Sequence, residues 1–527
     1  MPNWIALSVF VALFALVTGL GFWAARWRRG DLTLIDEWGL GGRQFGVLIT
    51  WFLLGGDLYT AYTVIAVPAA VYAIGAGGIF ALPYVVLTYP LVFLLMPRLW
   101  NVCKRHGFVT TADFVRGRYG NARLALAIAV TGILATLPYV ALQLLGMQVV
   151  IAAMGLGGGS GPLAELPLIL AFLVLAAYTY TSGLRAPAVI AMVKDVLIYI
   201  VVIVAVIVIP IRLGGYGRIF SLADAHFALQ RAATPPGTGS LILSPSAYWP
   251  YATLGLGSAF ALFMYPHSVT GVLSSARGSV IKRNTILLPA YSVLLGLIAL
   301  LGYMAIAANI QVAKPNDAVP ALFNAMFPSW FVGVAFAAIA IGALVPAAIM
   351  SIAAANLWTR NIYMAYVRPG ATAAQESSSA KIASFVVKLG ALLFIIWVPT
   401  AFAINLQLLG GIWILQTFPA LALGLHRRIF HDAALLWGWL AGMLAGTSMS
   451  FSQGVKPTFP LHLGGTTISA YIGLDALIVN VAVSAALTVI FDRIGVARGR
   501  DATAEADYEA PPEPVVPEST LGTPELA

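Results

Sequence analysis

The chain has 527 residues, of which 60% are hydrophobic and only 9% are charged, and its mean hydropathy is +0.90. Soluble proteins carry about 25% charged residues, so this composition excludes a soluble globular protein and indicates a membrane protein. The net charge of +9 does not indicate a nucleic-acid partner, because the basic residues are scattered between apolar runs and not gathered on one face.

Apolar runs of spanning length follow one another along almost the whole chain. A transmembrane helix needs about 20 such residues. The sequence therefore predicts an all-α membrane protein with about thirteen transmembrane helices, over residues 4–24, 46–74, 77–97, 124–153, 166–184, 189–213, 249–273, 285–309, 329–358, 383–404, 407–425, 433–453 and 470–491.

The positions of lysine and arginine predict the orientation, because these residues are enriched on the cytoplasmic side. With the N-terminus outside, 24 of the 29 basic residues, Lys194 and Lys388 among them, fall in cytoplasmic loops and adjoining helix ends. An odd number of helices then places the C-terminus inside. Residues 1–45 form an extra helix and a basic cytoplasmic loop, 214–248 form an outside loop, and the acidic, proline-rich residues 496–527 are expected to be a disordered cytoplasmic tail.

Asp57 is the strongest single indication of function. It is the only formal charge between Val47 and Phe80, and it follows Gly55 and Gly56. A carboxylate at mid-membrane costs about 2.5–3.5 kcal/mol on insertion scales, and glycine weakens a helix. A costly charge beside a weakened helix predicts an ion or solute site.

A second glycine- and proline-containing helix lies five helices later. It contains Gly255, Gly257 and Pro266, and its odd spacing from the first makes the two enter the membrane from opposite sides. Inverted repeats that each open with a broken helix are typical of secondary transporters. The repeats would be residues 46–213 and 249–425, followed by two extra helices over 426–495. The alternative is that glycine and proline are simply common in membrane helices.

Motifs for ATP-driven or enzymatic chemistry are absent: the sequence contains no GxxxxGK[ST], no HExxH and no CxxC. The chain is therefore expected not to be an enzyme, and an ion gradient would supply the energy for transport. A channel is the rival class, since it also needs polar residues in the membrane, but it does not need two broken helices.

Four segments resemble the sodium:solute symporter family. They are GGDLYTAYT with PAAVYAIG (Gly55 to Gly75), TTADFVRGRYGNAR (Thr110 to Arg123), YTSGLRAPAVIAMVKD (Tyr180 to Asp195) and MYPHSVTGVLSSARGSVIKRN (Met264 to Asn284). The resemblance covers about residues 5–495 and implies a five-plus-five inverted-repeat, LeuT-like core in a bacterial cytoplasmic (inner) membrane.

Within that family, GALVPAAIMSIAAANLWTRNIY (Gly342 to Tyr363) and the GGD segment resemble the bacterial monocarboxylate permease branch. The resemblance implies uptake of a small carboxylate such as lactate, pyruvate or propionate, and in some members alanine. Another small solute such as an amino acid is the alternative. No organic cofactor and no obligate protein partner are indicated beyond the surrounding lipid.

The resemblance also implies a sodium site, in which carbonyls of the broken helix meet a carbonyl and two hydroxyls of a later helix. Alignment on GGDL assigns the carbonyls of Gly55 and Leu58. Alignment on AAIMS assigns Ala348 and Ser351, with Ile352 in place of the second hydroxyl. Alignment without a gap from NIY instead assigns Gly342, Val345 and Pro346, with no hydroxyl at all. A ligand is missing in both alignments.

The coupling ion therefore remains open between Na⁺ and a proton carried by Asp57. Thr60, Tyr62 and Thr63 follow the break and are candidate substrate-binding residues, with helix–helix hydrogen bonding as the alternative.

Three further charged or titratable residues are expected to have structural roles. Lys388 is predicted to extend to the cytoplasmic surface, Arg185 to form a salt bridge, for example with Asp195, and His267 to serve packing more than proton relay.

Overall fold

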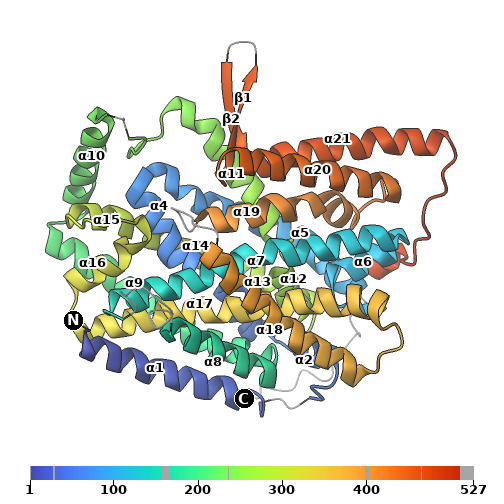
Figure 1. Cartoon of the computed structure of the whole chain (residues 1–527), viewed down its shortest axis with the longest axis horizontal. Helices are drawn as coiled ribbons and strands as arrows, with labels where there is room; N and C mark the ends of the chain where they lie inside the picture. The colour runs from blue at the N-terminus through green and yellow to red at the C-terminus, as the bar shows by residue number, and fades with distance from the viewer. Residues whose placement is uncertain are drawn as a thin grey trace, which may run out of the picture.

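The computed structural model describes residues 2–27, 30–156, 166–234, 237–397, 404–463 and 466–510. Figure 1 shows a bundle of long helices that run roughly along one direction. In the described part of the chain, nine helices are long and apolar enough to cross a membrane, and one bent pair makes a tenth.

Helix α17 (Ser329–Trp358) lies at the centre of the bundle. It is apolar on all sides, as expected of a buried helix, and 94% of its most apolar stretch is buried. Helices packed against it include α1 (Trp4–Trp23), α7 (Ala122–Ala153), α9 (Arg185–Leu213), α12 (Pro266–Leu273) and α18 (Ala373–Trp397). Figure 1 shows α7 and α17 side by side in the middle of the molecule.

The other elements surround this centre. The longer helices are α5 (Ala81–His106), α8 (Leu166–Ser182), α10 (Tyr216–Ala232), α11 (Pro245–Leu262), α20 (Asp432–Ser452) and α21 (Ile472–Arg493). The shorter α-helices are α2 (Ile35–Leu40), α3 (Val47–Gly56), α4 (Val67–Ile74), α6 (Thr111–Tyr119), α13 (Gly278–Leu287), α14 (Pro289–Ala299), α15 (Leu301–Ala307), α16 (Ala318–Met326) and α19 (Ile404–Ile414). Short 3₁₀ and π segments are η1 (Gly41–Arg43), η2 (Tyr62–Ala66), η3 (Ala76–Phe80), η5 (Pro315–Asp317), η6 (Thr359–Val367), η7 (Leu415–Thr417), η8 (Pro419–Leu423) and η9 (Glu505–Tyr508).

Each of the thirteen expected spans overlaps helical structure, but several are not single helices. The range 46–74 is divided into α3, η2 and α4, the range 285–309 into α13, α14 and α15, and the range 407–425 into α19, η7 and η8. The count of thirteen spans and the orientation of the chain stay predictions. The expected outside loop at 214–248 contains helix α10 and the start of α11.

One hairpin was missed by the all-α prediction. Strands β1 (Thr458–Leu463) and β2 (Thr466–Tyr471) pair antiparallel between α20 and α21, with Thr458 opposite Tyr471. Figure 1 shows the hairpin projecting from the bundle beside these two helices. Most of it lies between the last two expected spans, and two six-residue strands give only a short alternating pattern.

The first part of the expected disordered tail is instead packed against the bundle. After α21 the chain turns back to α5 and α6. Tyr508 is buried there, with 3% of its surface exposed. The guanidinium groups of Arg98 and Arg118 lie 5.4 and 5.3 Å from the centre of its ring. Asn101 donates a hydrogen bond of 3.1 Å to the Tyr508 carbonyl.

Acidic residues of the same segment pair with basic residues of α5 and α6. Asp501 lies 2.7 Å from Arg118, and Asp507 lies 2.8 Å from His106 and 3.4 Å from Arg105. The composition was correctly identified as acidic, but the prediction of disorder is wrong up to residue 510 because the acids match a basic surface. Residues 511–527 lie outside the described part of the chain.

Candidate functional site

The first helix break lies where the glycine pair predicted it. Helix α3 ends at Gly56, helical structure resumes at Ala61 and continues in the π segment η2, and regular α-helix returns only with α4 at Val67. A Cβ atom added at Gly55 would lie 2.1 Å from Cζ of Tyr291, and one at Gly56 would lie 3.0 Å from Nζ of Lys194. The two glycines therefore do more than weaken the helix: they let an aromatic ring and an ammonium group approach the backbone at the break.

Backbone groups released by the break find partners inside the protein, as they must in a membrane. Gln143 of α7 accepts a hydrogen bond of 3.0 Å from the Ala61 N–H, and the Thr60 hydroxyl accepts one of 3.0 Å from the Tyr62 N–H. The Thr63 hydroxyl donates to the Leu58 carbonyl.

The second break lies between α11 and α12, which are bent by 46° at Phe263–Tyr265. Pro266 occupies the first turn of α12, where its missing N–H costs nothing. Gly255 and Gly257, which we expected to cause the break, lie inside the continuous helix α11. Pro266 is therefore the residue in the sequence that marks this break.

The two breaks meet at Asp57. Its Oδ2 lies 3.4 Å from Nε2 of His267 and 3.4 Å from the hydroxyl of Ser268, both in the first turn of α12. Asp57 is 7% exposed and His267 is 1% exposed. The N-terminal end of a helix favours an anion, so the position suits a carboxylate. We expected a structural role for His267 more than a proton relay, and the structure places this residue beside Asp57.

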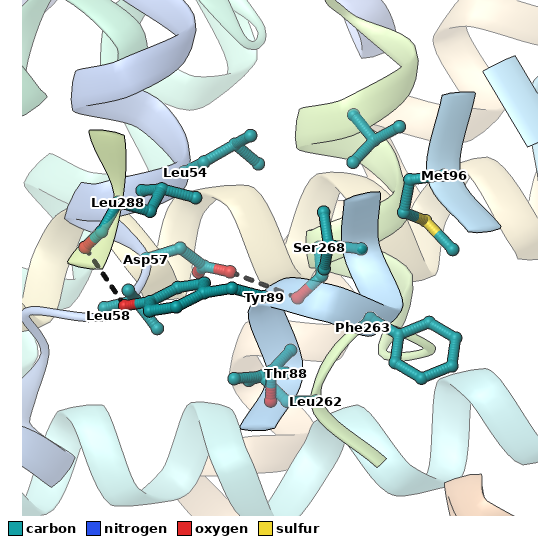
Figure 2. Close-up of a pocket in the computed structure, with 12 residues that line it drawn as sticks. Leu54, Asp57, Leu58, Thr88, Tyr89, Met96, Leu262, Phe263, Ser268 and Leu288 are labelled. Carbon is teal, nitrogen blue, oxygen red and sulfur yellow. Dashed lines mark hydrogen bonds between the residues drawn. The ribbon is translucent and has the colours of Figure 1, made fainter. Parts of the chain in front are cut away.

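A small cavity opens beside Asp57. Its volume is about 50 Å³, and its lining is mostly apolar, with Asp57, Thr88, Tyr89 and Ser268 as polar members. Figure 2 shows the Asp57 carboxylate directed at Ser268, and the Tyr89 hydroxyl bonded to the Leu288 carbonyl. The residues come from α3 and the break after it, from α5, from α11–α12 and, for Leu288, from the junction of α13 and α14, so the cavity joins both broken helices.

A second charged group lies on the other side of the first break. Lys194 of α9 is fully buried, and its ammonium lies 3.1 Å from Oδ1 of Asp195. It donates hydrogen bonds to the carbonyls of Gly56 and, at 3.0 Å, Tyr59. The assignment of Lys194 to a cytoplasmic helix end is therefore wrong, because α9 begins at Arg185 and places Lys194 more than two turns inside it.

Tyr291 of α14 completes this group. Its hydroxyl donates a hydrogen bond of 2.7 Å to Oδ2 of Asp195, and its backbone carbonyl accepts one of 3.1 Å from the Tyr59 hydroxyl. The sequence offered a signal for Lys194 and Asp195, namely two adjacent charges inside a long apolar run. Nothing in the sequence indicated Tyr291.

The carbonyls assigned by alignment on GGDL bond to other parts of the same segment. The Gly55 carbonyl accepts the N–H of Leu58 at 2.9 Å, and the Leu58 carbonyl accepts the Thr63 hydroxyl. The carbonyls that meet a cationic group are those one residue later, of Gly56 and Tyr59.

On α17, the two alternative alignments fall at different depths. A Cβ added at Gly342 would lie 3.8 Å from the Tyr59 carbonyl oxygen. The Ser351 hydroxyl instead bonds to the Ala348 carbonyl at 2.8 Å and receives a hydrogen bond of 3.2 Å from Ser384 of α18. Gly342 therefore lies close to the first break, whereas the Ser351 hydroxyl is bonded within α17 and to α18.

The three expected substrate residues are all buried at or after the first break. Thr60 and Thr63 bond to the local backbone, as described above, whereas the Tyr62 ring packs against Tyr84 at a centroid distance of 6.2 Å. Their arrangement allows a role in binding and equally a role in holding the break.

Two other predicted roles differ in the structure. Lys388 does not reach the surface: it is 1% exposed and donates a hydrogen bond of 2.8 Å to the Ser384 hydroxyl. Arg185 pairs with Glu37 and not with Asp195.

Comparisons with known proteins identify the family. The model of the "Sodium:solute symporter family" matches residues 38–446. The chain belongs to this family. It is 56% identical to the "Monocarboxylate transport permease protein" of Rhizobium johnstonii over 489 residues, which is 93% of this chain and 97% of that one. It is 33% identical to the uncharacterized symporter YodF of Bacillus subtilis, over 84% of this chain and 87% of that one.

A solved structure shares the fold. It is a Na⁺-coupled sialic acid symporter in a substrate-bound, outward-open state, with a TM-score of 0.73 and 16% identity, covering 94% of this chain and 99% of that one. Together with its apolar helices, membership in the family makes the chain a multi-pass membrane transporter of the symporter class.

Proposed function

We propose that this protein imports a small monocarboxylate of the lactate, pyruvate or propionate type by symport, with alanine as a further substrate. The observation that carries the proposal is the 56% identity to a monocarboxylate transport permease over nearly the full length of both chains. An inward Na⁺ or proton gradient drives the uptake.

The arrangement of the two breaks supports alternating access between inverted repeats over residues 46–213 and 249–425. Each repeat opens with an interrupted helix, and the interruptions meet at the buried carboxylate of Asp57. A site held between two half-helices can be exposed to either side by a small movement of one repeat against the other. Asp57 contributes to ion coupling, and Thr60, Tyr62 and Thr63 contribute to the substrate site.

The mostly apolar lining of the cavity beside Asp57 suits a substrate with a short hydrocarbon part. A cation taken up with the substrate offsets the charge of its carboxylate. The protein is expected in a bacterial cytoplasmic membrane, with the N-terminus outside and the C-terminus inside.

Uptake of labelled lactate into proteoliposomes that contain the purified protein tests the proposal. We expect accumulation against a gradient, and competition by pyruvate and propionate. Uptake of sugars or amino acids other than alanine, with no inhibition by short monocarboxylates, would refute the substrate class. Unitary currents in a planar bilayer would refute symport in favour of a channel.

A further inference from the structure

Lys194 is a buried ammonium with two hydrogen bonds and one ion pair at the first helix break. An ammonium has three N–H donors, and three acceptors surround this one: the carbonyls of Gly56 and Tyr59 and the carboxylate of Asp195. Lysine is rarely this deeply buried unless it is paired, and an ionisable residue within a membrane protein is a candidate for a functional role.

The acceptors are the kind that bind a hard cation. Backbone carbonyls and a carboxylate are the oxygen ligands that suit alkali and alkaline-earth ions, and unwound helix backbone coordinates Na⁺ or H⁺ in secondary transporters. At this break the carbonyls of Gly56 and Tyr59 point at the Lys194 nitrogen. The facing helix α17 presents Gly342, which has no hydroxyl, near the Tyr59 carbonyl.

The protein also holds the lysine in place from two sides. Gly56 has no side chain, and a Cβ there would lie 3.0 Å from Nζ. The carboxylate that pairs with Lys194 is itself fixed by the Tyr291 hydroxyl at 2.7 Å, and Tyr291 is bonded to Tyr59 at the break. The ammonium, its counter-ion and the broken helix therefore form one connected unit.

We propose that Lys194 is a built-in cation that occupies the carbonyl pair at the break, so that this symporter needs no Na⁺ at that position and is coupled to protons. The inference rests on the proposed function of the protein as a monocarboxylate symporter. It names Lys194 as a residue that determines the coupling ion.

Protonation of Lys194 replaces the binding of a metal ion at the break. Lysine, unlike arginine, can lose its proton in a buried site. A proton from the outer solution converts the Lys194 amine to the ammonium, which draws α9 and the break together; release of that proton to the inner solution frees them. The groups around Lys194 are Asp195 on its own helix, Tyr291 of α14 through its bond to Asp195, the backbone carbonyls of Gly56 and Tyr59 and, electrostatically, Asp57.

Substitution of Lys194 by alanine should create a Na⁺ site. Removal of the side chain leaves two carbonyls and a carboxylate around an empty space, which Na⁺ can enter. We expect thermal unfolding of purified wild-type protein to be the same in NaCl and in choline chloride, and the Lys194→Ala variant to be stabilised by Na⁺ specifically. Na⁺ at about ten times its dissociation constant would shift the folding equilibrium about elevenfold.

Two further variants serve as matched controls. Lys194→Met removes the charge but fills the space, so that it should lose uptake without gaining a response to Na⁺. Lys388→Ala removes another buried lysine, one that bonds to Ser384 and not to the broken helix, and should also show no response. Wild-type protein that is stabilised by Na⁺ relative to choline would overturn the inference, and this arm decides even if the alanine variant cannot be purified.

Measurements of lactate uptake distinguish a failure of this inference from a failure of the proposed function. We expect wild-type lactate uptake to proceed when choline replaces Na⁺ and to be lost with a protonophore. Uptake that requires Na⁺ would overturn the role of Lys194 and leave the proposed function intact. No lactate uptake under either gradient would overturn the proposed function, whereas the unfolding comparison would still test the cation site.

Discussion

Substitution of Gly55 by alanine tests whether the first break depends on close packing. The added Cβ would lie 2.1 Å from Cζ of Tyr291, 2.2 Å from Cε2 and 2.6 Å from the hydroxyl oxygen. Ordinary contact begins at about 3.4 Å, so the ring or α3 must move by more than 1 Å. Overpacking of a core typically costs about 1–3 kcal/mol, and this displacement corresponds to the upper part of that range.

The movement would also reach the charged group behind the ring. The Tyr291 hydroxyl bonds to Asp195, which pairs with Lys194. A displaced ring breaks or lengthens the bond to Asp195. We therefore expect Gly55→Ala to lower the initial rate of lactate uptake at least tenfold in proteoliposomes, in addition to lowering the unfolding temperature.

Gly255→Ala is the matched control. Gly255 lies in α11 with nothing within 4 Å of an added Cβ, and alanine is favoured over glycine in a helix by about 1 kcal/mol. This variant should be as stable and as active as the wild type, or slightly more stable. Equal unfolding temperatures and equal uptake for the two variants would refute the packing argument. A Gly55→Ala, Tyr291→Ala double variant should lose less stability than the sum of the two single changes.

Three other changes test separate parts of the structure. Asp57→Asn keeps the shape of the side chain but removes its charge, and we expect accumulation of lactate to be abolished; a fully active variant would remove Asp57 from the mechanism. Glu37→Gln leaves the guanidinium of the buried Arg185 without its counter-ion and should destabilise the protein by about 1–3 kcal/mol, which thermal unfolding would measure; an unchanged midpoint would contradict this. The pKa of Asp507 is lowered by a hydrogen bond from the Ala504 N–H and then by contact with a histidine, so its contribution to docking of residues 496–510 is present above its ordinary pKa of 3.8 and is lost as the pH falls through the lowered value. Hydrogen exchange of this segment should rise at acid pH and, at neutral pH, in Asp507→Asn; exchange that is insensitive to both would rule out the pairing as the cause of docking.

The sequence indicated the buried carboxylate of Asp57 at the first helix break, but not the residues that contact it. A charge beside glycines in an apolar helix identified Asp57, because the cost of burying a carboxylate is visible without coordinates. The contact between Asp57 and His267 joins residues 210 positions apart, and no local pattern encodes it. His267 follows Pro266 in the sequence, but the direction of its side chain depends on the 46° bend between α11 and α12.

The misplacement of Lys194 has a related cause. Basic residues near the end of an apolar run were counted as topology signals, which is correct for most of them. Lys194 differs because α9 starts earlier than the apolar run does, with Arg185 already buried against Glu37. A one-dimensional hydropathy pattern cannot distinguish a lysine at a helix end from one that meets the backbone of a broken neighbour.

The charges around the first break also bear on stoichiometry. Before the coupling proton binds, Asp57, Asp195 and the unprotonated Lys194 amine together carry two negative charges, and the buried His267 adds none when neutral. A monocarboxylate that binds beside them without a proton would raise the total to three negative charges in a region of low dielectric, which is strongly unfavourable. One cation bound with each substrate anion, here a proton, leaves the total unchanged, so that the loaded site holds no more charge than the empty one. The arrangement therefore favours one proton for each monocarboxylate, and uptake that is electroneutral.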